Sequence, residues 1–183
     1  MEHIPADLAL VRDFVNSRDP ESGTDDLAEP AALRSWLEGR ALFRGSRDPR
    51  PEEVANARRV GEAIRSLAAV NAGHPVDAGA LEILNEAGRQ APLALGFDAT
   101  GSSELRADDD GVRGAMARLL AIVHDAMSRG TWVRMKPCER HSCRWLFYDQ
   151  AKNRSGKWCS MAVCGNRTKA EAYRRRQSGD APA

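Results

Sequence analysis

Four cysteines dominate the chemistry that this chain could perform. Cys138, Cys143, Cys159 and Cys164 are its only cysteines, and they form two C-x4-C pairs separated by fifteen residues. Two short loops that each offer two thiolates are what a tetrahedral zinc site needs. Because all four positions are cysteine, no coordination position remains for water. The pattern therefore predicts a structural Zn2+ ion and no catalytic one.

Two other interpretations of the cysteines remain open. They could be four unrelated free thiols, or His141, inside the first loop, could replace one of them as a ligand. We expect His141 to be exposed instead. Disulfides are not expected, because the chain starts without a signal-peptide pattern and we expect a cytoplasmic location, where thiols stay reduced. The longest apolar runs, such as Leu119 to Val123, are too short to cross a bilayer, so no membrane partner is expected.

The cysteines need short elements to position them. We expect a strand over 131–136, and a hairpin in which Arg144–Asp149 pairs with Lys157–Cys159. Three aromatic residues should surround the metal with apolar surface: Trp145, Phe147 and Trp158. A module this small cannot bury enough core to fold unaided, and structural zinc contributes on the order of 10 kcal/mol.

A helix follows the last cysteine. Gly165 is expected in a backbone conformation closed to larger residues. The helix begins at Asn166, or slightly later if Thr168 and Glu171 form a capping box. Its apolar residues are expected to pack on the finger: Ala170, Ala172 and Tyr173.

Charge is segregated along the chain although the net charge is only +1. Residues 129–177 hold 13 Lys and Arg against 3 Asp and Glu, whereas residues 1–128 hold 14 Arg against 22 Asp and Glu. Such asymmetry is typical of a module that meets a polyanion. The expected nucleic-acid contacts are Arg144, Lys152, Arg154, Lys157, Arg167, Lys169, Arg174, Arg175 and Arg176, and the basic charge continues through Arg134, Lys136 and Arg140. A solvated helix that only keeps the protein in solution is the alternative.

Residues 1–131 read as a helical domain. Helices are expected over 6–17, 30–39, 51–72, 77–89 and 110–129, with one hairpin formed by 93–98 and 103–107. The 51–72 segment carries an apolar stripe and should turn Arg65 away from it. The 110–129 segment should turn Met127 inward. Asn16, Ser17 and Arg18 could line a small pocket or simply end a helix. Residues 178–183 are expected to be a disordered tail.

The residues Cys164-Gly165-Asn166-Arg167, with the paired spacing and the basic helix, resemble the CGNR zinc finger. The segment Phe14 to Asp19, with Leu33, Trp36 and Leu37, resembles the start of the ABATE domain that accompanies this finger. The resemblance implies a bacterial, stress-induced transcription regulator that binds DNA through the finger. One departure is that the run from Tyr148 to Lys152 lacks an Arg at the family's usual basic position.

These observations lead to one interpretation and two alternatives. We expect a predominantly helical α+β chain, with a helical domain over 1–131 and a four-cysteine finger over 132–177. It would act as a regulator that binds duplex DNA, as a monomer or homodimer, with a small-molecule or protein effector at the helical domain. The alternatives are an RNA- or ribosome-associated zinc protein and a protein-interaction module. No nucleophile–base pair or open metal position points to an enzyme.

Overall fold

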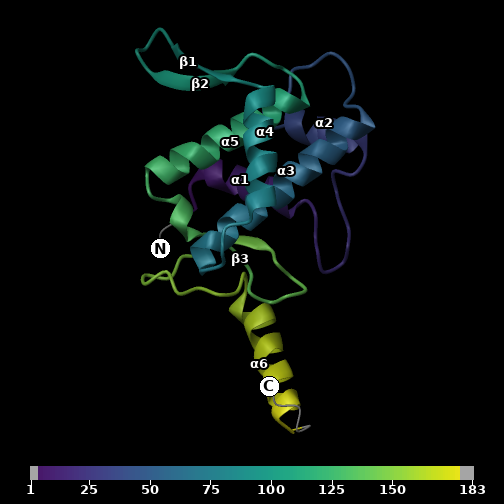
Figure 1. The fold of residues 1–183 in the computed structure, drawn as a ribbon, viewed down its shortest axis with the longest axis vertical. Coiled ribbons are helices and arrows are strands. Elements are labelled where there is room, and N and C mark those ends of the chain that lie inside the picture. Colours follow the sequence, from purple (N-terminus) through teal and green to yellow (C-terminus); the bar gives the residue numbers. More distant parts are fainter. Residues whose placement is uncertain (1–3, 178–183) are drawn as a thin grey trace.

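The computed structural model describes residues 4–177, so the expected tail at 178–183 lies outside the described residues. The predicted α+β fold with mostly helical content is confirmed (Figure 1). In chain order the elements are α1 (Ala6–Asn16), α2 (Pro30–Glu38), α3 (Pro51–Ala69), the 3-10 helix η1 (Val70–Ala72), α4 (Ala78–Gln90), β1 (Leu93–Phe97), β2 (Ser103–Ala107), α5 (Val112–Ser128), the 3-10 helix η2 (Trp132–Arg134), β3 (Met135–Pro137), β4 (Leu146–Tyr148), the π-helix η3 (Met161–Gly165) and α6 (Asn166–Gln177).

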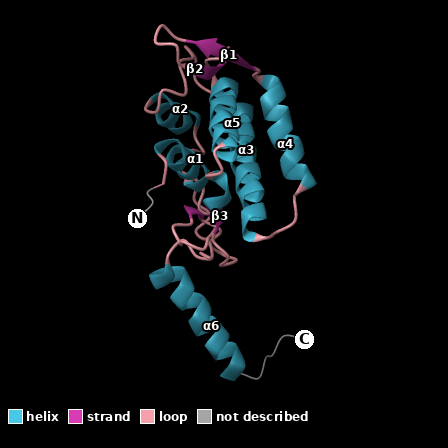
Figure 2. Cartoon of the chain, turned by 90° about the vertical axis from the view of Figure 1, so that its left-hand side faces the viewer, coloured by secondary structure: helices cyan, strands magenta, loops and turns pink. Residues whose placement is uncertain are grey.

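Helix α3 lies at the centre of the helical layer, beside α1, α4 and α5 (Figure 2). Pro51 begins it because a first helical position needs no N–H donor. Its stripe is buried as predicted, with Val60 and Ile64 both 0% exposed. Full burial of such a side chain stabilises the fold by roughly 1.5–3 kcal/mol. Gly73, at φ 88°, reverses the chain after η1.

The flanking helices follow the predicted pattern with one exception. The Asp77 carboxylate caps α4 by accepting hydrogen bonds from the N–H groups of Gly79 and Ala80, at 2.9 and 3.2 Å. In α5, Val112, Met116, Leu119 and Val123 are buried. The expectation for Met127 is wrong, because it is 44% exposed. Ala126 is buried in that last turn, and successive helical residues point about 100° apart.

The hairpin of β1 and β2 closes the end of the helical layer far from α6 (Figure 1). Leu93 pairs with Ala107 and Phe97 with Ser103 in an antiparallel register. The base of the hairpin is packed, since Ala107 is buried beside Leu93. Its outer part is exposed, with Leu95 at 62% and Phe97 at 69%.

The finger begins with a second small sheet, and its pairing differs from the prediction. β4 pairs with β3, with Met135 opposite Tyr148 and Pro137 opposite Leu146, so the hairpin of 144–149 with 157–159 is wrong. The strand predicted over 131–136 starts only at Met135, because η2 precedes it. Arg144 adopts φ 48° and turns the chain back after Cys143. Leu146 and Tyr148 can then enter the core beside β3.

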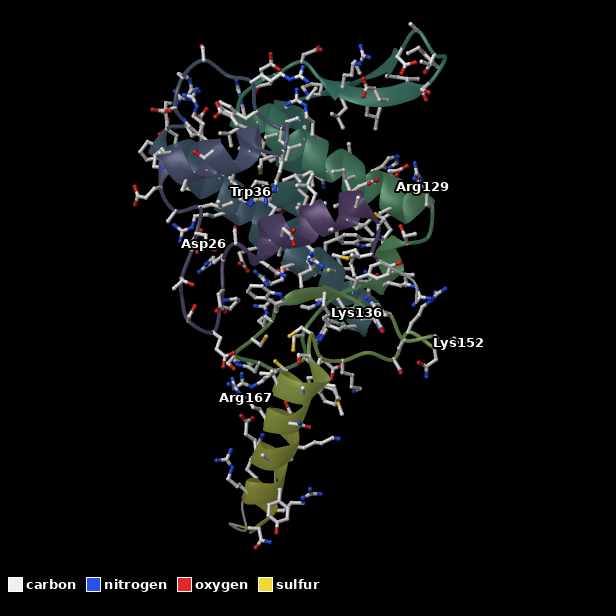
Figure 3. The ribbon with its side chains drawn as sticks, turned by 180° about the vertical axis from the view of Figure 1, so that it is seen from behind. Asp26, Trp36, Arg129, Lys136, Lys152 and Arg167 are labelled. Atoms are coloured by element: carbon white, nitrogen blue, oxygen red, sulfur yellow. The ribbon has the colours of Figure 1, made fainter. Side chains whose placement is uncertain are left out.

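The hydrophobic core is continuous from the helical layer into the finger. Trp132, Met135, Leu146 and Tyr148 belong to the same buried cluster as the residues of α1, α3 and α5. β3 therefore lies directly under the helices, where Figure 3 shows Lys136 between the helical layer and α6. Burial on both sides of the boundary fixes the orientation of the finger on the helices.

Candidate metal centre and basic surface

The four cysteine sulfurs lie together, within 4.8 Å of one another. Cys138 follows β3, and Cys143 closes a tight turn in which its N–H donates to the Arg140 carbonyl at 2.9 Å. Cys159 comes just before Ser160, whose hydroxyl accepts from the N–H of Val163 and caps η3. Cys164 lies inside η3. We call the segments 138–143 and 159–164 the first and the second knuckle. The first follows the end of a strand, and the second includes the start of a helix.

The sulfur geometry fits a tetrahedral metal site. Sulfurs about 2.3 Å from a central zinc ion are about 3.8 Å from one another in a tetrahedron. The Cys143–Cys159 and Cys159–Cys164 sulfur distances are both 3.7 Å. A disulfide would need about 2.05 Å, and all four cysteines are free.

Electrostatics makes this cluster a poor place for bare thiolates. Burial raises the pKa of Cys143 to about 11, and the charge of Cys138 adds to the effect. Burial raises the pKa of Cys159 as well, followed by the charges of Cys138 and Cys143. Four thiolates at this spacing repel one another, so a bound cation is what allows them to ionise together. A soft sulfur donor set of this kind fits Zn2+.

The predicted surroundings of the cysteines are only partly present. Trp158 packs against them, whereas Trp145 is 36% exposed and lines an open groove with Phe147 beside Cys159. Gly165 does not need a left-handed backbone, so that expectation is wrong. A Cβ there would lie 2.5 Å from the Met161 sulfur and 3.4 Å from the Trp158 ring. Glycine instead leaves room for the Met161 side chain, since 3.4 Å is an ordinary contact distance. His141 is exposed, as expected.

A buried ion pair organises the loop between the two knuckles. The Lys136 ammonium donates to Asp149 at 2.8 Å, and both side chains are buried. Burial would raise the pKa of Asp149, but the hydrogen bonds from Lys136 and from the amides of Ala151 and Gly156 lower it below its usual value. A Cβ on Gly156 would lie 2.4 Å from the carboxylate, so glycine is required there.

The ion pair between Lys136 and Asp149 means that part of the predicted basic surface is wrong, because Lys136 and Arg134 bind the loop of the finger. Lys136 is 6% exposed and cannot reach a ligand. The Arg134 guanidinium donates to the carbonyls of Asp149 and Ala151, at 3.0 and 2.9 Å, and so serves the same loop. These two cations hold the finger together because the buried carboxylate and carbonyls need donors.

Two residues outside the finger join it to the helices, and sequence reasoning missed their role. The Asn16 side chain donates to the Leu146 carbonyl and accepts from the Leu146 N–H, both at 2.8 Å. It pairs with the edge of β4 as a strand would. The Asn16 side chain therefore does not cap the helix. Asn16 lines the open groove beside Trp145, whereas Ser17 and Arg18 line a separate small cavity beside Phe14.

Arg65 is the second of these residues and is 0% exposed, so the expectation that it faces away from the apolar stripe is wrong. Its guanidinium donates to the carbonyls of Val15, Arg18 and Arg144, at 2.7, 3.1 and 2.6 Å. The position of Arg65, directly after Ile64 of the apolar stripe, was the feature of the sequence that could have indicated its burial. Helical period alone could not reveal which carbonyls would need it.

Helix α6 leaves the metal centre and extends away from the rest of the protein (Figure 2). All twelve of its residues are described and none is buried, so the expected packing of Ala170, Ala172 and Tyr173 is wrong; Tyr173 is 58% exposed. The Thr168 hydroxyl donates to the Cys164 carbonyl at 2.9 Å, so it is not a cap. The helix continues directly from η3 and points away from the rest of the protein, so its apolar residues have no surface to pack against.

The nine predicted contact residues are all exposed. Arg144, Lys152, Arg154 and Lys157 lie on loops of the finger, and the other five lie on α6. Lys152 and Arg167 lie on opposite sides of the finger (Figure 3). Lys157 is paired with Glu139 at 3.2 Å, and Arg167 with Glu21 at 3.3 Å. The structure thus brings together the five on α6 and spreads the other four around the knuckles.

Comparison with protein families gives two matches that together span most of the chain. Residues 8–129 match the ABATE family, described as "Putative stress-induced transcription regulator". Residues 134–177 match the CGNR zinc finger. No curated protein matches the chain. Within residues 4–177, no helix combines the length and the apolar character needed to cross a bilayer.

Proposed function

Because the chain belongs to the ABATE family and carries a CGNR zinc finger, we propose that it is a transcription regulator that binds duplex DNA through α6. The finger over 132–177 is the binding module, and residues 1–131 regulate it. Both families are of regulatory or zinc-finger type, and we propose no enzymatic activity. The proposed location is the cytoplasm, where DNA is accessible in a bacterial cell and thiols stay reduced.

The observation that carries this proposal is that no residue of α6 is buried. A helix of 12 residues is about 18 Å long, enough to lie in or along a major groove. It carries five Lys and Arg residues against the single carboxylate of Glu171. A helix without a buried face is stable only if something anchors it, and η3 with Cys164 supplies the anchor at its start.

Zinc has a structural role in this proposal. Cys138, Cys143, Cys159 and Cys164 would hold one Zn2+ ion, and their four sulfurs fill its coordination sphere. The ion would fix η3 relative to the first knuckle. Since η3 continues into α6, it would also fix the direction in which the basic helix points.

The helical domain would sense an effector or mediate dimerisation. An open cleft of about 940 Å³ lies between β2 and α5. Arg44, Arg118 and His124 are among the residues that line it, so a polar small molecule fits its chemistry. The exposed apolar residues Leu95 and Phe97 on the hairpin support the second role, contact with another copy.

Binding to duplex DNA and to structured RNA of equal length, each titrated with salt, tests the proposal. We expect the zinc-loaded protein to prefer duplex DNA, with an affinity that falls linearly with salt on logarithmic axes. A preference for RNA would favour the RNA- or ribosome-associated alternative. Absence of binding to either nucleic acid at low salt would favour a protein-interaction module.

A further inference from the structure

One acidic residue of the helical domain reaches the finger and contacts two of its arginines. Glu21 lies in the loop between α1 and α2. One oxygen of its carboxylate lies 2.5 Å from an Arg140 Nη1 and 3.3 Å from an Arg167 Nη1. Arg140 belongs to the first knuckle, and Arg167 to the first turn of α6. Glu21 is more than 100 positions from each arginine in sequence, so only the fold brings it to them.

Arg140 is held more firmly than a typical surface arginine. Its side chain is only 14% exposed, and its second Nη lies 3.7 Å from the Glu171 carboxylate on α6. Its Nε is buried and, within residues 4–177, has no hydrogen-bond partner. Two guanidinium groups therefore converge on one anionic oxygen, with a further N–H donor buried beside them. Paired guanidiniums of this kind bind phosphate as well as carboxylate.

The loop presents Glu21 in a defined position. The Glu21 N–H donates to the Asp19 carboxylate at 2.8 Å, and a backbone turn closes between Asp19 and Thr24. Gly23, at φ 73°, permits this turn. The loop is anchored to α3 by the Arg58–Asp25 ion pair at 2.6 Å. Because the finger is itself fixed on the helices by Asn16 and the buried core, Glu21 stays opposite its arginines.

We propose that Arg140 and Arg167 form a site for a backbone phosphate of nucleic acid, and that Glu21 occupies this site in the free protein. Binding then requires the Glu21 carboxylate to leave, so the loop of the helical domain lowers the affinity of the finger. This inference rests on the proposed nucleic-acid binding of α6 and names its regulation. Arg140 is thereby added to the proposed nucleic-acid contact residues, and it lies beside the end of α6 nearest the metal centre.

The test is a comparison of duplex DNA affinity among zinc-loaded full-length variants. Glu21→Gln keeps the shape of the side chain and removes its charge, and we expect about 5-fold tighter binding than wild type. Glu29→Gln is the matched control, because it removes the same charge from an exposed position at the end of the same loop. We expect it to change affinity by less than about 2-fold.

A second background localises the effect. Arg167 is 55% exposed, so Arg167→Gln is not expected to disturb folding. In the Arg167→Gln background, Glu21→Gln should raise the affinity for duplex DNA by less than about 2-fold. Equal affinities of the Glu21 and Glu29 variants would overturn the site while leaving DNA binding intact. If Glu21→Gln raised the DNA affinity as much in the Arg167→Gln background as in wild type, the proposal that Arg140 and Arg167 form one site would be overturned. Failure of wild type and Glu21→Gln alike to bind would overturn both proposals.

Discussion

The two hydrogen bonds between the Asn16 side chain and β4 lead to a measurable prediction about stability. Asn16→Ala removes the partner of both the N–H and the carbonyl of Leu146, which is 0% exposed. An unsatisfied buried backbone group costs about 1–3 kcal/mol. Two such groups would therefore cost about 2–6 kcal/mol, a large part of the 5–15 kcal/mol typical of a domain.

Urea denaturation of the zinc-loaded protein, followed by circular dichroism, measures this loss. The matched control is Asn153→Ala. Asn153 is exposed, and within residues 4–177 its side chain forms a hydrogen bond only with the Ser155 hydroxyl. We expect the control to change the free energy of unfolding by less than about 0.5 kcal/mol. If Asn16→Ala were equally mild, the side chain would not join the finger to the helices in the way described.

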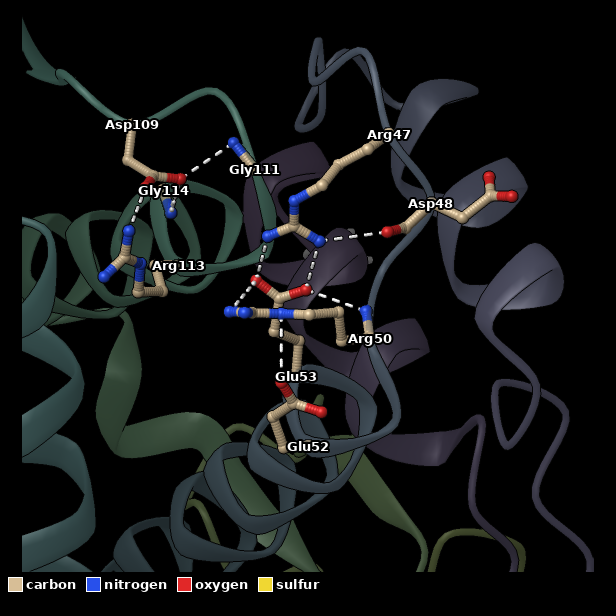
Figure 4. A network of polar contacts seen from close by, with 9 residues as sticks. All are labelled: Arg47, Asp48, Arg50, Glu52, Glu53, Asp109, Gly111, Arg113 and Gly114. Atoms are coloured by element: carbon tan, nitrogen blue, oxygen red, sulfur yellow. Dashed lines mark hydrogen bonds and ion pairs between the residues drawn. The ribbon is translucent and has the colours of Figure 1, made fainter.

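Three further predictions concern the metal, the basic helix and acid stability. Cys159→Ser should abolish stoichiometric zinc in metal analysis and unfold the finger, and a variant that retained one zinc per chain would contradict the four-sulfur site. Replacing residues 174–176, all arginine, with alanine should lower the salt slope of DNA binding by up to about 0.9 per lost phosphate contact, whereas an unchanged slope would exclude this end of α6 from the interface. Glu53 has its pKa lowered from 4.5 to about 2, first by the hydrogen bond from Arg47 (Figure 4). Glu53→Gln should therefore lower the free energy of unfolding by about 1–2 kcal/mol above pH 4.5, after allowance for the exposure of Arg47. The difference from wild type should shrink as the pH falls from about 4.5 and vanish below about pH 2, where the carboxyl is protonated in the folded state too. Urea denaturation at several pH values would contradict this if the difference did not change with pH.

Much of the helical layer was predictable because its signals are local. The apolar stripe of α3, the Asp77 cap of α4 and the hairpin after Pro92 each depend on residues only a few positions apart. Arg65 shows where such reasoning stops. Its period places it beside the stripe, but its burial depends on carbonyls from α1 and from the finger. Those carbonyls are 50 and 79 positions away.

The pairing of β4 could not be predicted either. Leu146 and Phe147 fit a strand in either partner choice, because strand propensity does not specify the neighbour. The turn at Arg144 and the burial of Leu146 beside Asn16 select β3. The same packing puts Lys136 beside Asp149, so a residue that counted as basic surface becomes part of the interior.

The sequence alone determined the four-cysteine centre, because ligand type and spacing within two short loops are local properties that tetrahedral coordination demands. It also determined that a basic helix follows Cys164. Only the tertiary structure decided that this helix has no packed face and that Glu21 lies against Arg140 and Arg167. Contacts between residues more than 100 positions apart depend on how the finger sits on the helices. That orientation comes from the shared core and from the pairing of Asn16 with β4.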